Sequence, residues 1–316
     1  MLTQDQITHF NIQGYVVEPN LIPKGMLGRV RMEYAQPLNT LYANWFAKAL
    51  VKTQPDHLNF WGKLQHTYEA GCDYSQPLDI LLPGDQILAN TPFQFGRAVF
   101  DMLRAKPLLD VIKRIIGPEL TKNPIQHVRL KPPVGELAFD ELRPRIGATD
   151  GRQVRAVALE DADKPDMFTC WIAITEATID NGCLHVQPKT ADQTIQPHCT
   201  RTQTDIAVGY IKEMGAIPLL VSAVSAVLFH SLTPHASLNN NTERLRWSFD
   251  IRFNKTGQPT GHCYCPEFIS RTRAHPQTEI HDWQVWKTMW ENIRSHWANA
   301  PHTDIHHGSS DVPNYA

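Results

Sequence analysis

The spacing of apolar residues changes near residue 120 and predicts two kinds of secondary structure. Before it, residues 23–49 and 90–116 have helical spacing, and the second stretch ends at Gly117-Pro118, a strong helix terminator. From Ile125 onward, apolar residues alternate or form short runs, separated by turn residues such as Asn181-Gly182. Such runs are typical of an antiparallel sandwich or jelly roll behind a mainly helical front.

Both ends of the chain carry further helix signals. Thr3 to Gln6 has the pattern of a capping box, and Gly14 offers a helix stop before the apolar residues 15–17. Near the other end, large apolar residues recur at intervals of three and four, which places them on one face of a helix. These residues are Trp283, Trp286, Trp290, Ile293 and Trp297. We expect this helix to pack on its own sheet, with a partner interface as the alternative.

The expected fold is therefore α+β, a jelly roll with N-terminal helices and an aromatic-striped C-terminal helix. No low-complexity linker or charge run divides the chain, so we expect a single domain over residues 1–316. Its parts are a mainly helical front (1–120), a jelly-roll core (125–255) and the C-terminal helix (278–300).

Composition and charge narrow the functional classes. The 316 residues are 42% hydrophobic with a formal net charge of −2, as in a globular protein with no electrostatic attraction to nucleic acid or an anionic membrane. No long apolar stretch or charged-then-apolar leader is present, so we expect a cytoplasmic protein. In that compartment its six cysteines should be free thiols, and Cys263-Tyr264-Cys265 lacks the second pair of a zinc site.

Candidate chemistry gathers between Phe229 and Asn254. An apolar run precedes His235, and a polar turn then leads to a second strand-like run, so the stretch predicts a hairpin with a histidine at one mouth. Arg246 and Ser248 lie two residues apart and would project from one strand face. A histidine for a metal and an Arg/Ser pair for a carboxylate could share one pocket.

Four stretches together resemble the phytanoyl-CoA dioxygenase family. They are LTQDQITHFNIQGYVV, PLLDVIKRIIGPEL, WIAITEATIDNGCLHVQP and the spacing from His235 to Ser248. The resemblance follows the family's order over nearly the full chain. It implies a double-stranded β-helix, a jelly-roll variant, and non-haem iron chemistry dependent on 2-oxoglutarate. The family includes fungal and bacterial enzymes that oxidise terpenoids and other secondary metabolites.

The resemblance also assigns roles to residues. Family chemistry needs H-x-D on one strand and a distal histidine on another, all on one face of Fe(II). His235 matches the distal histidine. Arg246 and Ser248 match the R-x-S pair that holds the distal carboxylate of 2-oxoglutarate, a bidentate task that suits arginine better than lysine.

The proximal metal motif departs from the family pattern. The slot often written W-H-Q-D reads Gly151-Arg152-Gln153-Val154 here, so Arg152 replaces histidine and Val154 replaces aspartate. A guanidinium offers no lone pair and valine has no heteroatom. We therefore expect His235 to be a vestigial ligand that does not hold iron alone.

Other acidic residues and histidines do not readily restore the set. Asp150 could share a strand face with Arg152 but would as readily pair with it. The residues Glu160, Asp161 and Asp163 read as a solvated acidic loop. His302-Thr303-Asp304 has the H-x-D spacing, but it follows the sheet in the polar tail.

A second departure lies before the distal-histidine strand. The family usually has Gly-Asp or Gly-Gly there, where glycine permits a tight turn, and this chain has Val224-Ser225. The change indicates either decay of the site or a harmless loop substitution. Trp171, Asn181 and Gly182 match the family and are interpreted as a core aromatic and a turn.

These patterns leave three functional hypotheses. The first is a non-catalytic subunit that pairs as a heterodimer with an active family homologue. That homologue would hold the iron and 2-oxoglutarate and act on a hydrophobic small molecule. A homodimer is the alternative assembly. Fungal meroterpenoid pathways contain inactive partners of this sort. The second is an iron and 2-oxoglutarate oxygenase with a rearranged metal site. The third is a metal-independent isomerase or lyase in which Arg152 polarises a carbonyl.

Overall fold

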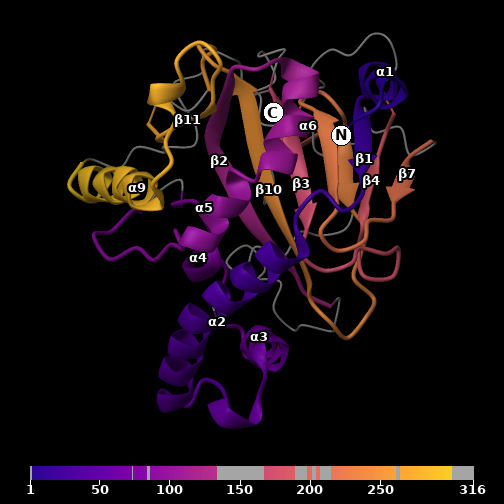
Figure 1. Cartoon of the computed structure of the whole chain (residues 1–316). Coiled ribbons are helices and arrows are strands. Elements are labelled where there is room, and N and C mark those ends of the chain that lie inside the picture. The colour runs from indigo at the N-terminus through magenta and orange to yellow at the C-terminus, as the bar shows by residue number, and fades with distance from the viewer. Residues whose placement is uncertain are drawn as a thin grey trace.

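Two antiparallel sheets form the core of the protein (Figure 1). The computed structural model describes residues 2–72, 74–83, 86–133, 167–188, 198–200, 204–206, 215–260 and 264–300. The six-stranded major sheet has the order β1-β8-β3-β10-β2-β11, and the minor sheet has the order β7-β4-β9. Trp171, Val227 and Phe229 of the major sheet share one apolar cluster with Leu184 and Val186 of the minor sheet. The two sheets therefore enclose an interior, as expected for a jelly roll.

The strand bounds follow the short apolar runs of the sequence. The major sheet consists of β1 (Tyr15–Glu18), β8 (Ala226–His230), β3 (Phe168–Ala173), β10 (Arg246–Lys255), β2 (Leu120–Lys131) and β11 (Phe268–Arg271). The minor sheet consists of β7 (Ile217–Leu219), β4 (Leu184–Val186) and β9 (His235–Ser237), and a separate pair consists of β5 (His198–Thr200) and β6 (Thr204–Ile206). Strands β1 and β11 come from outside residues 125–255, so the sheet draws on more of the chain than we expected.

Helices cover the outer face of the major sheet, which points away from the minor sheet (Figure 1). They are α1 (Gln4–Gln13), α2 (Lys24–Ala47), α3 (Phe60–Glu69), α4 (Ser75–Leu78), α5 (Arg97–Leu103), α6 (Lys106–Ile116) and α9 (Trp283–Ala298). Short 3-10 turns span Pro55–His57 and Pro276–Thr278. The mainly helical front and the helix at 23–49 are confirmed, and α1 has the expected capping box, with Gly14 as its left-handed C-cap.

The helix expected over residues 90–116 is wrong in its extent. Residues 91–96 are not helical, and the remainder divides into α5 and α6 at Arg104-Ala105. Pro107 lies in the first turn of α6, where its missing N–H costs nothing, but it could not have continued α5 through that point.

The hairpin expected over Phe229 to Asn254 is also wrong. Strand β9 pairs with β4 of the minor sheet, with His235 opposite Val186, whereas β10 lies between β3 and β2 of the major sheet. The chain crosses from one sheet to the other after β8 and returns before β10. Asn240 holds the return, because its Nδ2 atom donates to the carbonyls of Lys131 at 3.1 Å and Arg244 at 2.8 Å.

The aromatic stripe of α9 packs against its own chain. Trp286 and Trp290 are 1% and 0% exposed. The ring of Phe95 stacks on Trp290 with centroids 5.1 Å apart and meets Trp286 edge-on at 4.6 Å. The expectation of a helix packed on the body of the protein is confirmed, so the buried part of the stripe is not available as a partner surface.

Two expectations from composition can be compared with the described residues. Cys72, Cys170 and Cys183 are buried free thiols, and Cys265 is buried as well. Within the described part of the chain, none of the helices combines the length and apolar character needed to span a bilayer.

Candidate functional site

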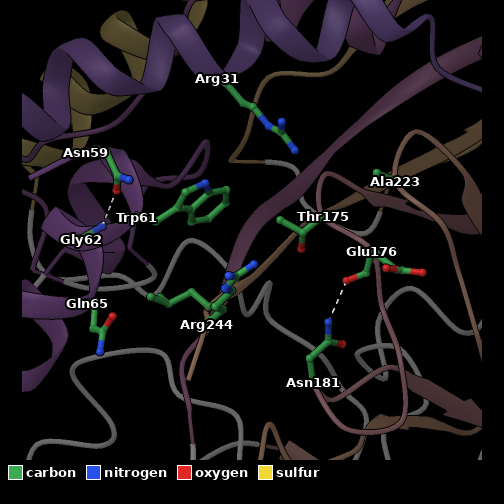
Figure 2. A pocket seen from close by; sticks show the side chains of 11 residues that line it. Arg31, Asn59, Trp61, Gly62, Gln65, Thr175, Glu176, Asn181, Ala223 and Arg244 are labelled. Atoms are coloured by element: carbon green, nitrogen blue, oxygen red, sulfur yellow. Dashed lines mark hydrogen bonds between the residues drawn. The ribbon is translucent and has the colours of Figure 1, made fainter. Parts of the chain in front are cut away.

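A pocket of about 700 Å³ opens at one end of the major sheet, between the helical front and the strand ends (Figure 2). We call it the outer pocket. It is lined by Arg31, Asn59, Trp61, Gly62, Gln65, Thr175, Glu176, Asn181, Ala223, Arg244 and Leu245. Sequence reasoning did not find it, because its lining comes from α2, α3 and the loops around β3 and β10.

A second polar region lies inside the jelly roll, on the opposite face of β10. Ser248 pairs with Ala173 and Asp250 with Trp171, two residues of the cluster shared by both sheets. Because side chains alternate along a strand, Arg246, Ser248 and Asp250 all face this interior, as expected for Arg246 and Ser248. The intervening side chains of β10 join the core beneath the helices.

Arg246 crosses the interior toward the minor sheet. Its Nη1 atom donates to the Gly182 carbonyl at 2.6 Å and lies 3.4 Å from the Ser237 hydroxyl. The guanidinium carbon is 5.2 Å from the centroid of the Trp171 ring, a cation–π contact. Trp171 is therefore both a core aromatic, as expected, and a support for this arginine. Burial lowers the pKa of Arg246 to about 10, so the side chain remains charged at neutral pH.

Two buried polar atoms of this pair lack partners among the described residues. They are Nε of Arg246 and Oγ of Ser248. The residues Arg246 and Ser248 are 2% and 0% exposed. A buried donor without an acceptor costs about 1–3 kcal/mol, which a bound carboxylate would offset. The chemistry of this pair fits the carboxylate of a 2-oxo acid, the role that the resemblance implies.

His235 begins β9 and faces the same interior. Its Nδ1 atom lies 2.9 Å from the carbonyl oxygen of Thr233, which can only accept a hydrogen bond, so Nδ1 carries the proton and Nε2 is the basic nitrogen. The ring is 4.3 Å from the Phe229 ring between centroids. The electrostatic influence of His235 reaches Asp250, which places both groups in one interior.

Asp250 forms an ion pair within the interior. Its Oδ2 atom accepts a hydrogen bond from Nε of Arg129 on β2 at 3.1 Å. Burial acts to raise the pKa of Asp250, but the charge and hydrogen bond of Arg129 prevail and hold it below its usual value. Asp250 is thus a paired carboxylate at neutral pH.

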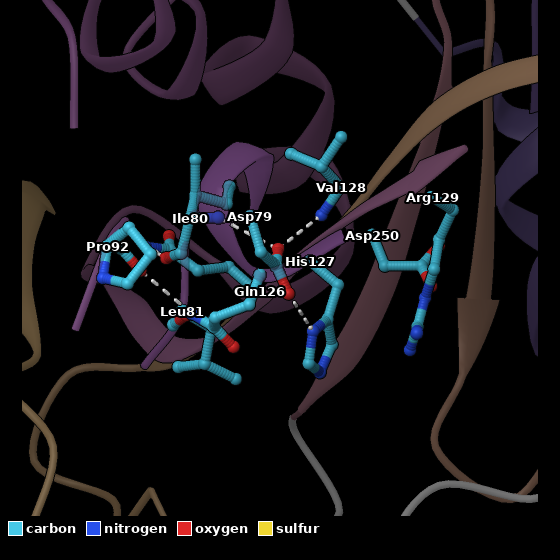
Figure 3. Close-up of polar contacts among 10 residues, drawn as sticks. Asp79, Ile80, Leu81, Pro92, Gln126, His127, Val128, Arg129 and Asp250 are labelled. Atoms are coloured by element: carbon cyan, nitrogen blue, oxygen red, sulfur yellow. Dashed lines mark hydrogen bonds and ion pairs between the residues drawn. The ribbon is translucent and has the colours of Figure 1, made fainter. Parts of the chain in front are cut away.

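A polar contact that sequence reasoning missed joins His127 to Asp79 (Figure 3). His127 Nδ1 lies 3.0 Å from Oδ2 of Asp79, and Oδ1 of Asp79 accepts from the main-chain nitrogens of Val128 at 2.7 Å and Ile80 at 2.8 Å. The carboxylate is fixed on the open side of β2 and orients the imidazole. The strand alternation of β2 could have placed His127 and Arg129 on one face, but nothing in the sequence indicates Asp79.

Burial lowers the pKa of His127, and the nearby Arg129 lowers it further, while Asp79 and Asp250 act in the opposite direction. The net effect favours a neutral imidazole. Because the Nδ1–H group of His127 donates a hydrogen bond to Asp79, the lone pair of the neutral ring is on Nε2. This arrangement is that of an oriented general base.

The described residues of the interior do not supply a donor set that fits Fe(II). Among the described residues, no three His, Cys, Asp or Glu side chains gather in a way that could hold a metal ion. The proximal slot at Arg152 and Val154 lies outside the described residues, as do the other ligands considered, Asp150, Glu160, Asp161, Asp163, His302 and Asp304. Neither Arg152 nor Val154 carries a side-chain lone pair for a metal, so the assignment of His235 as the single residue at the family's three ligand positions rests on the sequence.

The turn before β8 keeps the conformation that glycine would favour. Val224 has a φ of 67°, in the left-handed region that β-branched residues rarely adopt. The strain is offset by packing, because Val224 is 4% exposed in the main core and its carbonyl accepts from Ile22 N at 2.8 Å. Ser225 adds a hydrogen bond from the Asn20 nitrogen at 3.0 Å. The substitution is therefore accommodated by the fold, which favours the harmless loop change.

Asn181 and Gly182 have the structural roles expected of them. Asn181 Oδ1 accepts from the Thr178 nitrogen at 2.8 Å and its Nδ2 donates to the Glu176 carbonyl at 2.9 Å, which closes the turn before β4. Gly182 has a φ of 85°, and a Cβ atom there would lie 2.5 Å from the Leu238 carbonyl oxygen. Only glycine fits this position without a clash with the Leu238 carbonyl oxygen.

Comparisons with known proteins agree with this architecture. Residues 144–248 match the family model for phytanoyl-CoA dioxygenase (PhyH). The matched stretch ends at Ser248 of the candidate carboxylate site. No curated protein matches the sequence.

Solved structures share the fold at low sequence identity. A non-haem monooxygenase, ThoJ in its apo form, has a TM-score of 0.55 at 17% identity, over 93% of this chain and 98% of its own. The epimerase SnoN, solved with Fe³⁺, α-ketoglutarate and nogalamycin RO, has a TM-score of 0.50 at 13% identity, over 82% and 86%. EvdO2 from Micromonospora carbonacea var. aurantiaca has a TM-score of 0.50 at 17% identity, over 82% and 95%. At these identities the comparison shows a shared jelly-roll fold alone.

Proposed function

We propose that this chain, which matches the phytanoyl-CoA dioxygenase family model over residues 144–248, is a subunit without iron-dependent activity of its own. It pairs in the cytoplasm with an active homologue of the same family and supports that enzyme's oxidation of a hydrophobic secondary metabolite of the terpenoid class. The biosynthetic setting is suggested by neighbours such as SnoN, whose solved complex contains nogalamycin RO.

One contrast within the interior carries the proposal. Arg246 and Ser248 present unpaired buried donors suited to a carboxylate, yet His235 is the single residue that matches a family metal ligand. A protein that retains the scaffold and the hydrogen-bond donors for a ligand's carboxylate, but lacks the proximal metal ligands, is suited to a supporting role. An oxygenase with rearranged ligands would have to draw donors from outside the described residues, such as Asp150.

Co-expression with the most similar active homologue of the host tests the pairing. We expect one complex whose mass, measured by light scattering after gel filtration, equals one copy of each chain, with iron bound in the ratio of one per complex. Elution as separate species would contradict the proposal. A complex of two copies of this chain, with the homologue left unbound, would replace the heterodimer with the homodimer.

Metal binding by the isolated chain separates the proposal from the rearranged oxygenase. We expect no stoichiometric iron uptake and no succinate from 2-oxoglutarate. Arg152→His combined with Val154→Asp should restore iron binding at least in part, and adding His235→Ala should abolish it again. Stoichiometric iron and succinate formation by the wild-type chain would refute the supporting role.

A second candidate function is favoured by the Asp79–His127 contact. A neutral imidazole that is oriented by a carboxylate suits a metal-independent isomerase or lyase. It faces an interior in which Arg246 and Ser248 can donate hydrogen bonds to the carboxylate of a ligand. His127 Nε2 would take a proton from a carbon next to a carbonyl, and the C–H electron pair would enter the resulting enolate. The imidazolium, whose N–H proton exchanges with solvent, would then return a proton at another position. No oxidant or reductant is consumed.

The two candidates differ in their dependence on His127. Exchange of solvent deuterium into a bound 2-oxo acid, followed by NMR, reports proton transfer without requiring the natural substrate. If the second candidate is correct, the chain should catalyse exchange, and His127→Gln should reduce its rate by at least about 100-fold. Arg152→Ala should also reduce turnover if Arg152 polarises the carbonyl. The supporting role expects no exchange above the buffer rate.

A further inference from the structure

The outer pocket is separate from the jelly-roll interior. Trp61 lies above Trp247, whose side chain is on the helix-covered face of β10, while Arg246 and Ser248 point to the other face. The ring centroids of Trp61 and Trp247 are 6.1 Å apart at 76°. A molecule in the outer pocket would therefore not occupy the carboxylate site proposed above.

Three side chains enter the outer pocket from three parts of the chain (Figure 2). Arg31 comes from α2, Trp61 from α3 and Arg244 from the segment before β10. With Glu176, the charged residues of the lining amount to two guanidiniums and one carboxylate. The lining thus favours an anion, and its aromatic member favours a flat partner.

The positions of Arg31 and Trp61 are fixed by the surrounding structure. Arg31 Nη2 donates to the Ile174 carbonyl at 2.9 Å, which holds the guanidinium at the end of β3. Phe60 meets Trp61 edge-on at 5.1 Å and stacks on Trp247 at 5.4 Å, so the indole rests on a packed aromatic layer. Asn59 caps α3 by accepting from the Gly62 nitrogen at 2.9 Å. A binding surface that is already ordered loses little entropy when a ligand binds.

We propose that the outer pocket is a binding site for a planar conjugated ring system that bears a carboxylate. The ring lies against Trp61 and the carboxylate pairs with the guanidiniums of Arg31 and Arg244. A volume of about 700 Å³ is within the range of small-molecule sites and accommodates two or three fused rings. Gln65 and Thr175 supply polar groups at the pocket wall.

Direct titration with 2-naphthoate, measured by calorimetry on the full chain, tests the site. We expect saturable binding with one molecule per chain. Methyl 2-naphthoate, which has the same rings without the charge, should bind at least about 10-fold more weakly, because a charge-assisted pair is lost. Cyclohexanecarboxylate, which has the charge without the flat ring, should also bind at least about 5-fold more weakly.

Matched variants locate the binding. Arg244→Gln should weaken 2-naphthoate binding at least about 10-fold, because it removes a guanidinium that is exposed in the free protein. Arg97→Gln, which changes an arginine with a side chain 74% exposed on α5, is the control and should leave binding unchanged. Trp61→Leu should weaken binding without changing its stoichiometry, and thermal unfolding checks that the variant is folded.

Two results would overturn the assignment. One is the absence of saturable 2-naphthoate binding by the wild-type chain. The other is binding that Arg244→Gln leaves unchanged or that Arg246→Lys abolishes, since the latter residue belongs to the interior. The titration needs no partner subunit, so its failure would leave the pairing proposal untouched, and the failure of pairing would leave the outer pocket untouched.

Discussion

Arg246 donates from Nη1 to the main-chain oxygen of Gly182 at 2.6 Å, which ties the start of β10 in the major sheet to the turn before β4 in the minor sheet. The contact needs Gly182 in a left-handed conformation and close to Leu238. Arg246, which can donate to a ligand's carboxylate in the interior, is therefore positioned by a turn that is distant from it in the sequence.

Gly182→Ala should be markedly more destabilising than Gly257→Ala. Both glycines have similar φ values, 85° and 88°, so both variants bear the strain of a left-handed alanine, about 1–2 kcal/mol. Only at Gly182 does the new Cβ meet a backbone oxygen, at 2.5 Å, whereas Gly257 has open space. We expect the clash to add about 1–3 kcal/mol to the loss of unfolding free energy, measured in urea. Equal losses would show that the turn can relax.

Arg246→Lys should weaken binding of 2-oxoglutarate at least about 10-fold, because lysine cannot reproduce the planar two-donor geometry. Ser248→Ala should weaken it by a smaller factor, about 2- to 10-fold, through loss of one neutral hydrogen bond. Calorimetry in the presence of a chelator measures binding without metal. The exposed variants Arg97→Lys and Ser295→Ala are the controls. Unchanged affinity in both interior variants would remove the carboxylate site.

His127→Gln should flatten the acid side of the stability profile. The folded-state pKa of His127 is below the ordinary value of 6.5, chiefly through burial, so the unfolded chain binds more protons as the pH falls below 6.5. The contribution of the neutral imidazole is fully present above pH 6.5 and is lost as the pH falls through the folded pKa. Unfolding free energies between pH 7.5 and 5 measure this slope. His57→Gln, at an exposed histidine, should leave the slope unchanged; equal slopes in the His127 variant and the wild type would contradict the assignment.

Trp290→Ala should destabilise the protein by about 3–5 kcal/mol, because a fully buried indole leaves a cavity beside Phe95. Val285→Ala, on the exposed side of α9 with 47% of its surface accessible, should change stability by no more than about 0.5 kcal/mol. Urea unfolding measures both. A small effect of Trp290→Ala would show that α9 contributes little to the core and would reopen the stripe as a partner surface.

The elements whose signals are local could be predicted from the residues alone. The capping box before α1, the long α2, the short apolar runs of the sheet and the stripe of α9 all follow from spacing within a few residues. The same strand alternation places Arg246 and Ser248 on one face of β10. The resemblance to a family supplied the role of that pair, which remains a prediction, together with the observation that Arg152 and Val154 cannot ligate iron.

The pairing of the strands and the contacts between distant groups became known from the folded arrangement. The turn after His235 looks like that of a hairpin, yet β9 and β10 enter different sheets, because pairing energy comes from neighbours elsewhere in the chain. Asp79 meets His127 across the open side of β2, and Arg31, Trp61 and Arg244 converge from three segments. Such contacts depend on the packing of helices and sheets, which no local pattern encodes. They revealed the outer pocket and added the His127–Asp79 contact to the interior site.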